Sequence, residues 1–234
     1  MSNLKYDGFE LEYFDKSTNF RKYQLNLIKK FVKNNTAEVG PGRGGFVNYY
    51  KKYCKFLHLI EPDRKLYGLL KQKYSNKRIT IKNSTINKVQ TKFDTIMYFD
   101  VLEHIQNDLK EVLSAKKRLK KNGYLIFSVP AFQIFYNNFD KSVGHYKRYN
   151  KEDFKIIASK ANLKIEKLIY YDSFGLLLII LSKIFNISNK NLGKNIKVWN
   201  FFIPLSKLLD LITFNKFGKS LICVFKIWLI IKIF

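Results

Sequence analysis

The chain has 234 residues and a mass of 27.8 kDa, which suits one domain of ordinary size. It is 47% hydrophobic and 16% aromatic, and this composition excludes an intrinsically disordered chain although 26% of the residues are charged. Two cysteines far apart, Cys54 and Cys223, give no disulfide framework and indicate a reducing compartment. The first seventeen residues lack a basic region followed by an apolar run, so we expect no signal peptide and a cytoplasmic protein.

The formal net charge of the chain is +25, from 43 Lys and Arg against 18 Asp and Glu. Such a surplus suits nucleic acid, anionic lipid or an anionic substrate as a partner. The basic residues are spread along the chain without a dense block, and a general bias toward Lys, Asn and Ile accounts for them equally well. The charge by itself therefore leaves the partner open.

The C-terminal part is both apolar and basic. Residues 175–234 carry nine lysines and one acid, Asp210, for a net charge of +8. Charged residues interrupt three apolar runs, at 174–181, 199–214 and 221–234, before any reaches the length of a membrane-spanning helix. Apolar faces beside lysines suit helices that lie on an anionic membrane surface, and they also suit buried helices with solvated edges.

Hydrophobic periodicity predicts that strands and helices alternate from residue 37 to about residue 172. Helices are expected at 19–33, 45–54, 62–74, about 108–119 and 150–162. Strands are expected at 37–39, 56–61, 78–84, 93–100, 123–130, 163–172 and 218–227. This order predicts an α/β fold with a mostly parallel sheet and helices on both faces. Residues 173–216 are too many for a loop and should form helices of their own.

A glycine-rich turn follows the first expected strand and opens a helix. Its glycines are Gly40, Gly42, Gly44 and Gly45, and they allow a tight turn with close approach of a ligand to backbone N–H groups. The first, second and fourth satisfy the dinucleotide fingerprint GxGxxG, whereas Glu38 and the first three satisfy an acidic-x-Gly-x-Gly-x-Gly pattern. Glu38 favours the second pattern, because a carboxylate there repels a pyrophosphate but suits a ligand that carries a cation.

An acidic residue also ends the second expected strand. Glu61 lies seventeen residues beyond Gly44, and an acid at such a position can accept hydrogen bonds from both hydroxyls of a ribose. Strand ends often carry surface acids, so Glu61 alone is weak support. Together with the glycine turn, it favours a nucleoside-containing ligand.

Several segments with this spacing resemble the class I S-adenosylmethionine-dependent methyltransferases. The segments that carry the resemblance are 38–44, 59–63, 93–105 and 119–130. Residues 144–154 are similar to a segment of methyltransferases in quinone-like, lipid-linked or cell-surface glycan pathways, and residues 217–226 are similar to the last strand of that group. The resemblance covers about residues 20–172 well.

The resemblance implies one Rossmann-like methyltransferase domain. Its sheet would have seven strands, six of them parallel and the last one reversed. The parts would be an N-terminal cap helix in 1–35, a cofactor-binding core in 36–172, a helical insertion in 173–216, and the last strand and tail in 217–234.

The resemblance also implies S-adenosylmethionine as the methyl donor. Glu38 would contact its ammonium group and Glu61 its ribose, while Ser84 stands where many members have an aspartate beside the adenine. The implied cofactor-binding residues are Glu38, Gly40, Pro41, Gly42, Gly44, Glu61, Pro62, Ser84, Phe99 and Asp100.

His145 is the candidate catalytic residue. It follows the fifth expected strand, at the edge where ligands bind in open α/β sheets, and a histidine can accept a proton near neutral pH. Tyr146, Arg148 and Tyr149 beside it are candidate acceptor contacts. The alternative is a loop held together by local hydrogen bonds. Glu103 and His104 are expected to have a local structural role, and His58 is expected to belong to the core; the three histidines and two cysteines show no metal-ligand spacing.

The sequence therefore predicts a methyltransferase that acts on a small-molecule, lipid-linked or glycan-related acceptor, handled at an anionic membrane surface. One alternative is a nucleic-acid methyltransferase, although the fourth strand lacks an Asn-Pro-Pro-Tyr type of motif. A second is a catalytically silent cofactor-binding subunit, which the departure at Ser84 allows. A third, a nicotinamide-dependent oxidoreductase, is disfavoured by Glu38. The sequence predicts no oligomeric state.

Overall fold

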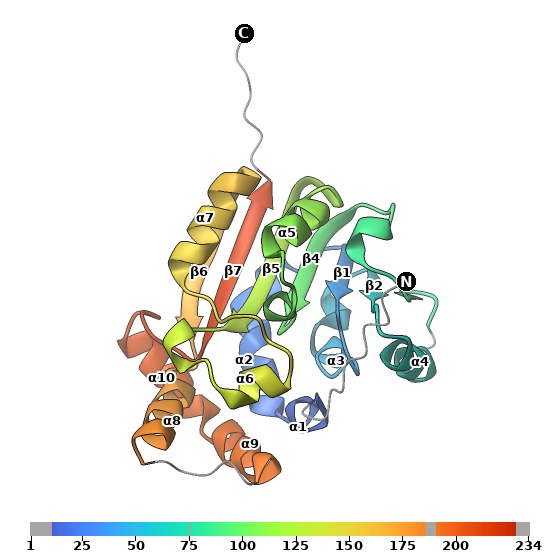
Figure 1. Cartoon of the computed structure of the whole chain (residues 1–234). Helices are drawn as coiled ribbons and strands as arrows, with labels where there is room; N and C mark the ends of the chain where they lie inside the picture. The colour runs from blue at the N-terminus through green and yellow to red at the C-terminus, as the bar shows by residue number, and fades with distance from the viewer. Residues whose placement is uncertain (1–10, 75, 186–190, 228–234) are drawn as a thin grey trace.

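A computed structural model describes residues 11–74, 76–185 and 191–227. Its centre is a seven-stranded sheet with the strand order β3-β2-β1-β4-β5-β7-β6 (Figure 1). The strands are β1 (Asn35–Val39), β2 (Phe56–Ile60), β3 (Ile79–Lys82), β4 (Phe93–Phe99), β5 (Leu119–Pro130), β6 (Leu163–Tyr171) and β7 (Ser220–Ile227). The order reverses between β1 and β4, which is where ligands bind in open α/β sheets.

The sheet has the expected directions. Neighbouring strands among β1 to β5 pair in parallel, and β7 lies antiparallel between β5 and β6, with Tyr124 opposite Lys226 and Leu163 opposite Ile227. Among the described strands, β7, the last in the chain, is thus the only reversed one, as predicted. The β7 residues Leu221–Phe225 are fully buried, because helices cover both faces of the sheet there.

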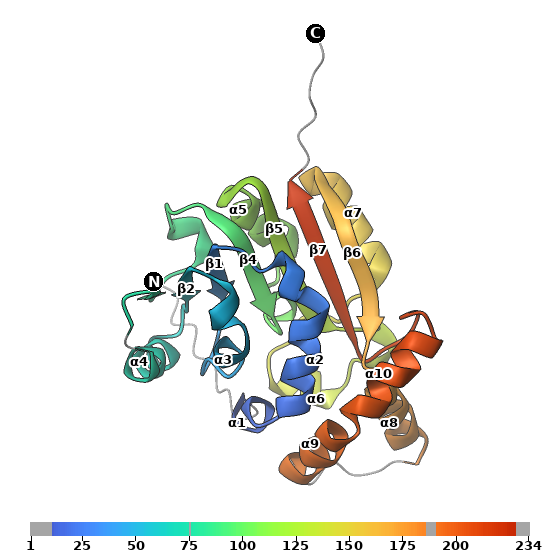
Figure 2. The same cartoon turned by 180° about the vertical axis from the view of Figure 1, so that it is seen from behind.

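The helices that flank the sheet carry the two hydrophobic cores. In chain order they are α1 (Leu11–Asp15), α2 (Thr18–Ile28), α3 (Val47–Tyr50), α4 (Arg64–Lys73), α5 (Asp108–Lys116), α6 (Asn138–Ser142), α7 (Lys151–Ala161), α8 (Ser173–Ile184), α9 (Leu192–Phe201) and α10 (Ile203–Ile212). Helices α5 and α7 cover one face, and α2 and α3 cover the other (Figures 1 and 2). Val112 and Phe154 belong to the first core, and Ile28 and Tyr50 belong to the second.

The C-terminal insertion forms helices α8, α9 and α10, which confirms the expectation for residues 173–216. Both views show these helices together below the sheet, at the end where β4 and β5 finish (Figures 1 and 2). The chain then turns back into β7, which runs away from them. The last apolar run, 221–234, is a strand as far as Ile227, and residues 228–234 lie outside the described residues.

Some local elements differ from the sequence predictions. The helix expected at 45–54 is one α-helical turn, α3, followed by a 3-10 turn at Lys51–Tyr53, in keeping with the low helix propensity of its aromatic run. Helix α6 was not expected. It forms because Asn137 and Asp140 make a capping box, in which each side chain accepts a hydrogen bond from the other residue's backbone N–H.

Candidate active site

The glycine turn after β1 has the backbone that its sequence predicts. Gly40, Gly42 and Gly44 all have positive φ angles, between 58° and 73°. A Cβ atom on Gly40 would lie 2.8 Å from the side chain of Val101, and one on Gly44 would lie 2.7 Å from the ring of Tyr74. These positions therefore require glycine both for conformation and for space.

Glu38 ends β1 beside this turn and is almost completely buried. Its carboxyl group accepts a hydrogen bond from the hydroxyl of Tyr50. Burial raises the pKa of Glu38 to about 7, against the opposing effects of that hydrogen bond and of Arg21. A cation close to Glu38 would therefore favour its carboxylate form.

Glu61 follows β2 and is equally buried. Its two carboxyl oxygens accept hydrogen bonds from the backbone N–H groups of Gly42 and Asp63, each at 3.0 Å. Burial raises the pKa of Glu61 to about 7, although both hydrogen bonds act in the opposite direction. Glu61 therefore ties the glycine turn to the start of α4, where Asp63 caps the helix.

A cavity of about 1330 Å³ opens beside the glycine turn and brings most of the predicted site residues together. The predicted residues that line it are Glu38, Gly40, Pro41, Gly42, Glu61, Pro62, Phe99, Asp100, His145 and Arg148. Segments from β1, β2, β4 and the loop after β5 thus meet at one site, as the carboxyl ends of parallel strands should.

Four predicted residues are not among those that line the cavity. Gly44 belongs to the glycine turn but does not line the cavity, and Thr85 lines the wall where Ser84 was expected. Tyr146 is 58% exposed, while Tyr149 is fully buried and donates a hydrogen bond to the backbone carbonyl of Leu102. The two tyrosines beside His145 thus point away from the cavity that His145 lines.

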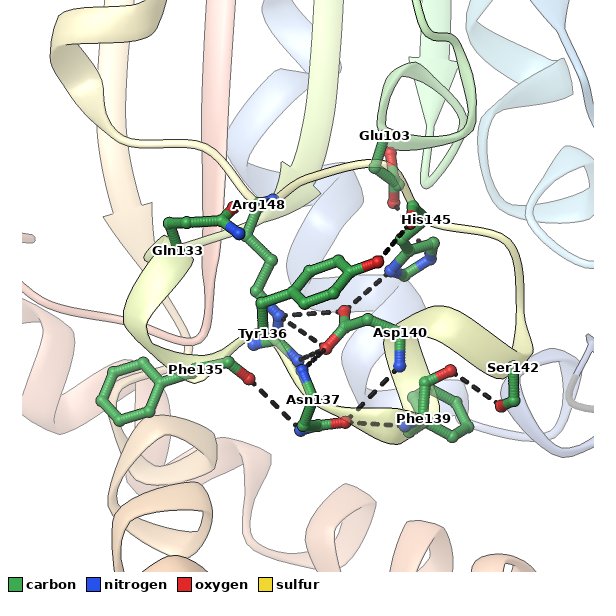
Figure 3. A network of polar contacts seen from close by, with 10 residues as sticks. All are labelled: Glu103, Gln133, Phe135, Tyr136, Asn137, Phe139, Asp140, Ser142, His145 and Arg148. Atoms are coloured by element: carbon green, nitrogen blue, oxygen red, sulfur yellow. Dashed lines mark hydrogen bonds and ion pairs between the residues drawn. The ribbon is translucent and has the colours of Figure 1, made fainter.

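His145 is held by a buried ion-pair network from α6 (Figure 3). Its Nδ1 lies 2.8 Å from Oδ1 of Asp140, and Arg148 donates hydrogen bonds to both oxygens of the same carboxylate at 2.9 and 2.9 Å. Burial alone would raise the pKa of Asp140, but the hydrogen bonds from His145 and Arg148 outweigh it and lower that pKa. Arg148, predicted as an acceptor contact, therefore serves this network.

The other ring nitrogen of His145 faces Glu103, with 3.9 Å between Nε2 and Oε1. Both carboxyl oxygens of Glu103 are buried without a hydrogen-bond partner among the described residues. Burial and the nearby Asp100 raise the pKa of Glu103 well above its usual range, and burial lowers the pKa of His104 to about 4. Both residues line the cavity beside His145.

Glu103, His104 and His145 are also a potential metal-ligand set. Their ligand atoms lie within 4.8 Å of one another, and a carboxylate with two imidazoles suits zinc and other transition ions. Spacing in the sequence could not reveal this set, because His145 lies far along the chain from the other two residues.

Four cationic residues that line the cavity were not predicted from the sequence: Arg21, Arg43, Lys183 and Lys219. Arg21 of α2 is 3.5 Å from Asp100, and its Nε is buried without a hydrogen-bond partner among the described residues. Lys219 precedes β7, 3.5 Å from Asp172, and its ammonium lies over the ring of Trp199. Arg21 stands among the apolar residues of the N-terminal cap helix, and this position in the sequence could have identified it as a candidate site residue.

Comparisons with known proteins agree with the fold and the site described above. A family profile described as a methyltransferase domain matches residues 11–168. No protein with a curated function matches the chain in sequence.

Solved structures share its fold at low sequence identity. The N-methyltransferase NodS from Bradyrhizobium japonicum, bound to S-adenosylhomocysteine, is 16% identical, with a TM-score of 0.54 over 90% of this chain and 87% of its own. Magnesium protoporphyrin IX methyltransferase from Synechocystis is 12% identical, with a TM-score of 0.57 over 93% and 84%. Phosphoethanolamine N-methyltransferase 2 from Haemonchus contortus, bound to S-adenosylmethionine, is 15% identical, with a TM-score of 0.62 over 93% of this chain and 57% of its own.

The family match covers more than half of the chain, and it includes the glycine turn, Glu61, the β4 motif and the His145 loop. The strand order, the reversed β7 and the site at the β1–β4 edge agree with it. The chain therefore belongs to the methyltransferase domain family and has the class I fold of S-adenosylmethionine-dependent methyltransferases.

Proposed function

We propose that this protein transfers a methyl group from S-adenosylmethionine to a small-molecule, lipid-linked or glycan-related acceptor. The observation that carries the proposal is one cavity with two kinds of wall. Glu38, Glu61 and the glycine turn form one wall, and the His145–Asp140 pair stands on another. A donor site and a proton acceptor thus face the same space.

The cofactor-binding residues fit the charge and shape of the donor. Glu38 would hold the ammonium of the methionine moiety, and the free Nε of Arg21 suits its carboxylate. Glu61 would exchange its hydrogen bonds from backbone N–H groups for those from the ribose hydroxyls, with Pro62 and Thr85 near the adenine. When bound, the donor supplies an electrophilic methyl group on a sulfonium.

His145 is the residue for proton removal from the acceptor. The Asp140 carboxylate accepts a hydrogen bond from Nδ1–H, which leaves Nε2 to take a proton from the acceptor nucleophile, and the charge of Asp140 stabilises the imidazolium that results. Alignment of the two substrates in the cavity supplies most of the rate enhancement, on the order of 7–11 kcal/mol in favourable cases. A base adds about 10²–10⁴-fold if the nucleophile must lose a proton.

The rest of the cavity suits an amphipathic acceptor. Leu178 and Ile179 of α8 and Ile196 and Trp199 of α9 give an apolar wall, while His145 lies at a polar end. The proposed base, His145, argues against a catalytically silent cofactor-binding subunit. Net charge remains the only support for a nucleic-acid acceptor, and Tyr146 and Tyr149 are left out of the proposed acceptor contacts because they do not line the cavity.

The proposal includes the location of the protein in the cell. Cys54 and Cys223 are both free thiols, which suits the reducing cytoplasm. The apolar, basic helices α8 to α10 suit work at the surface of an anionic membrane.

Calorimetric titration with S-adenosylhomocysteine and with NADH tests the donor assignment. We expect micromolar binding of the former and none of the latter. Glu61→Ala should weaken the binding by about 1–3 kcal/mol, since it removes a charged hydrogen-bond partner. Glu152→Ala, at an exposed acid on α7, is the matched control and should bind like the wild type. Tight NADH binding without S-adenosylhomocysteine binding would overturn the proposal.

A further inference from the structure

Helix α10 is reversed in polarity relative to an ordinary surface helix. Its buried residues include Ser206 and Asp210, while Leu208, Leu211 and Ile212 are exposed, Leu211 by 71%. A surface helix normally turns its apolar stripe toward the core and its polar face toward water. The outward face of α10 is therefore apolar where that of a surface helix is usually polar.

The buried polar residues have partners that hold α10 in this orientation. Asp210 accepts hydrogen bonds from the Tyr23 hydroxyl at 2.5 Å and from the backbone N–H of Asp172 at 2.7 Å. Asp172 in turn accepts hydrogen bonds from Ser206 at 2.6 Å and from Trp199 Nε1 at 2.8 Å. Because a half-satisfied buried carboxylate costs several kcal/mol, rotation of α10 about its axis is strongly disfavoured.

Helices α8 and α9 extend the same surface. Their exposed residues recur at helical spacing, and Phe201 at the end of α9 is 72% exposed. We call the whole the outer apolar surface, and it is represented by Leu181, Ile184, Phe201, Leu208, Leu211 and Phe214. Large apolar residues gathered on neighbouring helices mark a docking surface, whereas single ones are ordinary.

The charged residues exposed on helices α8 to α10 and the turn after them have one sign. Lys183, Lys194, Lys197 and Lys216 are exposed on the same helices and the turn after them. Asp210 is the only acid in residues 173–217, and it is buried. Lysine is depleted in protein–protein interfaces, but lysines beside apolar residues are typical of helices that lie on anionic lipid.

The helices of the outer apolar surface also wall the substrate cavity. Leu178 and Ile179 of α8 face the cavity, while Leu177 and Leu181 on the same helix are exposed. One layer of helix thus separates the exterior from the proposed acceptor site. Among the described residues, no helix combines the length and apolar character needed to cross a bilayer.

We infer that the outward faces of α8, α9 and α10 dock this enzyme on an anionic lipid bilayer, so that its acceptor is an amphipathic molecule taken from that membrane. The docking is argued from the exposed residues of these three helices, whereas the statement about the acceptor rests on the proposed function. Apolar side chains would enter the interface, and the lysines would meet anionic headgroups near the surface.

Vesicle co-sedimentation of the full chain tests the docking. Vesicles of phosphatidylcholine with phosphatidylglycerol should pellet the protein at low salt, pure phosphatidylcholine should pellet about tenfold less, and binding should weaken as salt rises. Phe201→Ser with Leu211→Ser should lower the partition coefficient at least tenfold. The matched control is Ile156→Ser on α7, at an apolar residue that is 53% exposed and remote from these helices, and it should bind like the wild type.

A charge-reversal pair separates lipid from other occupants. Lys194→Glu with Lys197→Glu should weaken binding to anionic vesicles, and Lys160→Glu on α7 should not. Equal pelleting of all variants, or equal binding to neutral and anionic vesicles, would overturn the inference. Self-association through this surface, seen by light scattering and lost in Phe201→Ser with Leu211→Ser, would overturn it in favour of a dimer contact. Calorimetry with S-adenosylhomocysteine keeps the two proposals apart, since the surface variants should bind it normally.

Discussion

His145 and Asp140 form a hydrogen-bonded pair in which Nδ1 of the imidazole lies 2.8 Å from a carboxylate oxygen, five residues away in the chain. Helix α6 supplies Asp140, and its capping box fixes the carboxylate before the chain turns back to His145. The pair favours the tautomer with the proton on Nδ1 and leaves Nε2 facing Glu103, which also lines the cavity. A loop residue thereby acquires the rigidity that proton transfer requires.

Replacement of His145 tests its role as a base. We expect His145→Ala to lower turnover at least tenfold, since a positioned base is worth about 10²–10⁴-fold. Affinity for S-adenosylhomocysteine should stay within about twofold, because the donor wall is formed by other segments. His58→Ala is the histidine control. An equal loss of turnover and donor affinity in His145→Ala would mark a structural loop residue instead.

The raised pKa of Glu38 predicts that donor affinity depends on pH. With a pKa of about 7 in the free protein, Glu38 is mostly neutral at pH 6, whereas the ammonium of the donor requires the carboxylate. Affinity for S-adenosylhomocysteine should therefore rise at least fivefold from pH 6 to pH 7, with proton release on binding. Calorimetry in buffers of different ionisation enthalpy measures both, and Glu38→Gln should reduce the dependence to the part that Glu61 contributes, since its pKa is also raised to about 7. A flat profile in the wild type would contradict this role.

Arg21 should recognise the carboxylate of the donor. Arg21→Ala removes a buried guanidinium, so the affinity for S-adenosylhomocysteine should fall about 10–100-fold, the scale of a charged hydrogen bond. Methylthioadenosine, which lacks the amino-acid moiety, should bind wild type and variant alike. If the variant loses affinity for both ligands equally, Arg21 supports the fold of α2 instead.

Chelation tests whether the Glu103–His104–His145 set needs a metal. Burial raises the pKa of Glu103 well above its usual range and so disfavours the carboxylate form that metal binding requires. We therefore expect methyl transfer to survive dialysis against EDTA with less than a twofold loss. Loss of activity that zinc restores, with one equivalent of metal bound, would identify a metal centre instead.

The sequence by itself determined the sheet and the glycine turn with the two acids beside it. Strands such as Phe93–Phe99 are short apolar runs, and glycine turns have local backbone requirements, so both signals are complete within a few residues. Glu38 and Glu61 could be predicted as a pair because the carboxyl ends of neighbouring parallel strands must meet. The helical character of 173–216 followed in the same way from its length and composition.

Tertiary structure alone decided the rest. Asp140, the partner of His145, lies in helix α6, whose signal in the sequence is a single capping box. Arg21 reaches the cavity only because α2 crosses the sheet beside Asp100. Tyr149 and Arg148, adjacent to His145 in sequence, were turned into the core and onto Asp140 by hydrogen bonds that no local pattern encodes. The outward face of α10 was equally invisible, since periodicity gives the two faces of a helix but not which one is buried. Which face of α10 is buried depends on the positions of Asp172 and Tyr23, which form hydrogen bonds with Asp210. These residues are distant in the sequence, so only the folded chain places them beside α10.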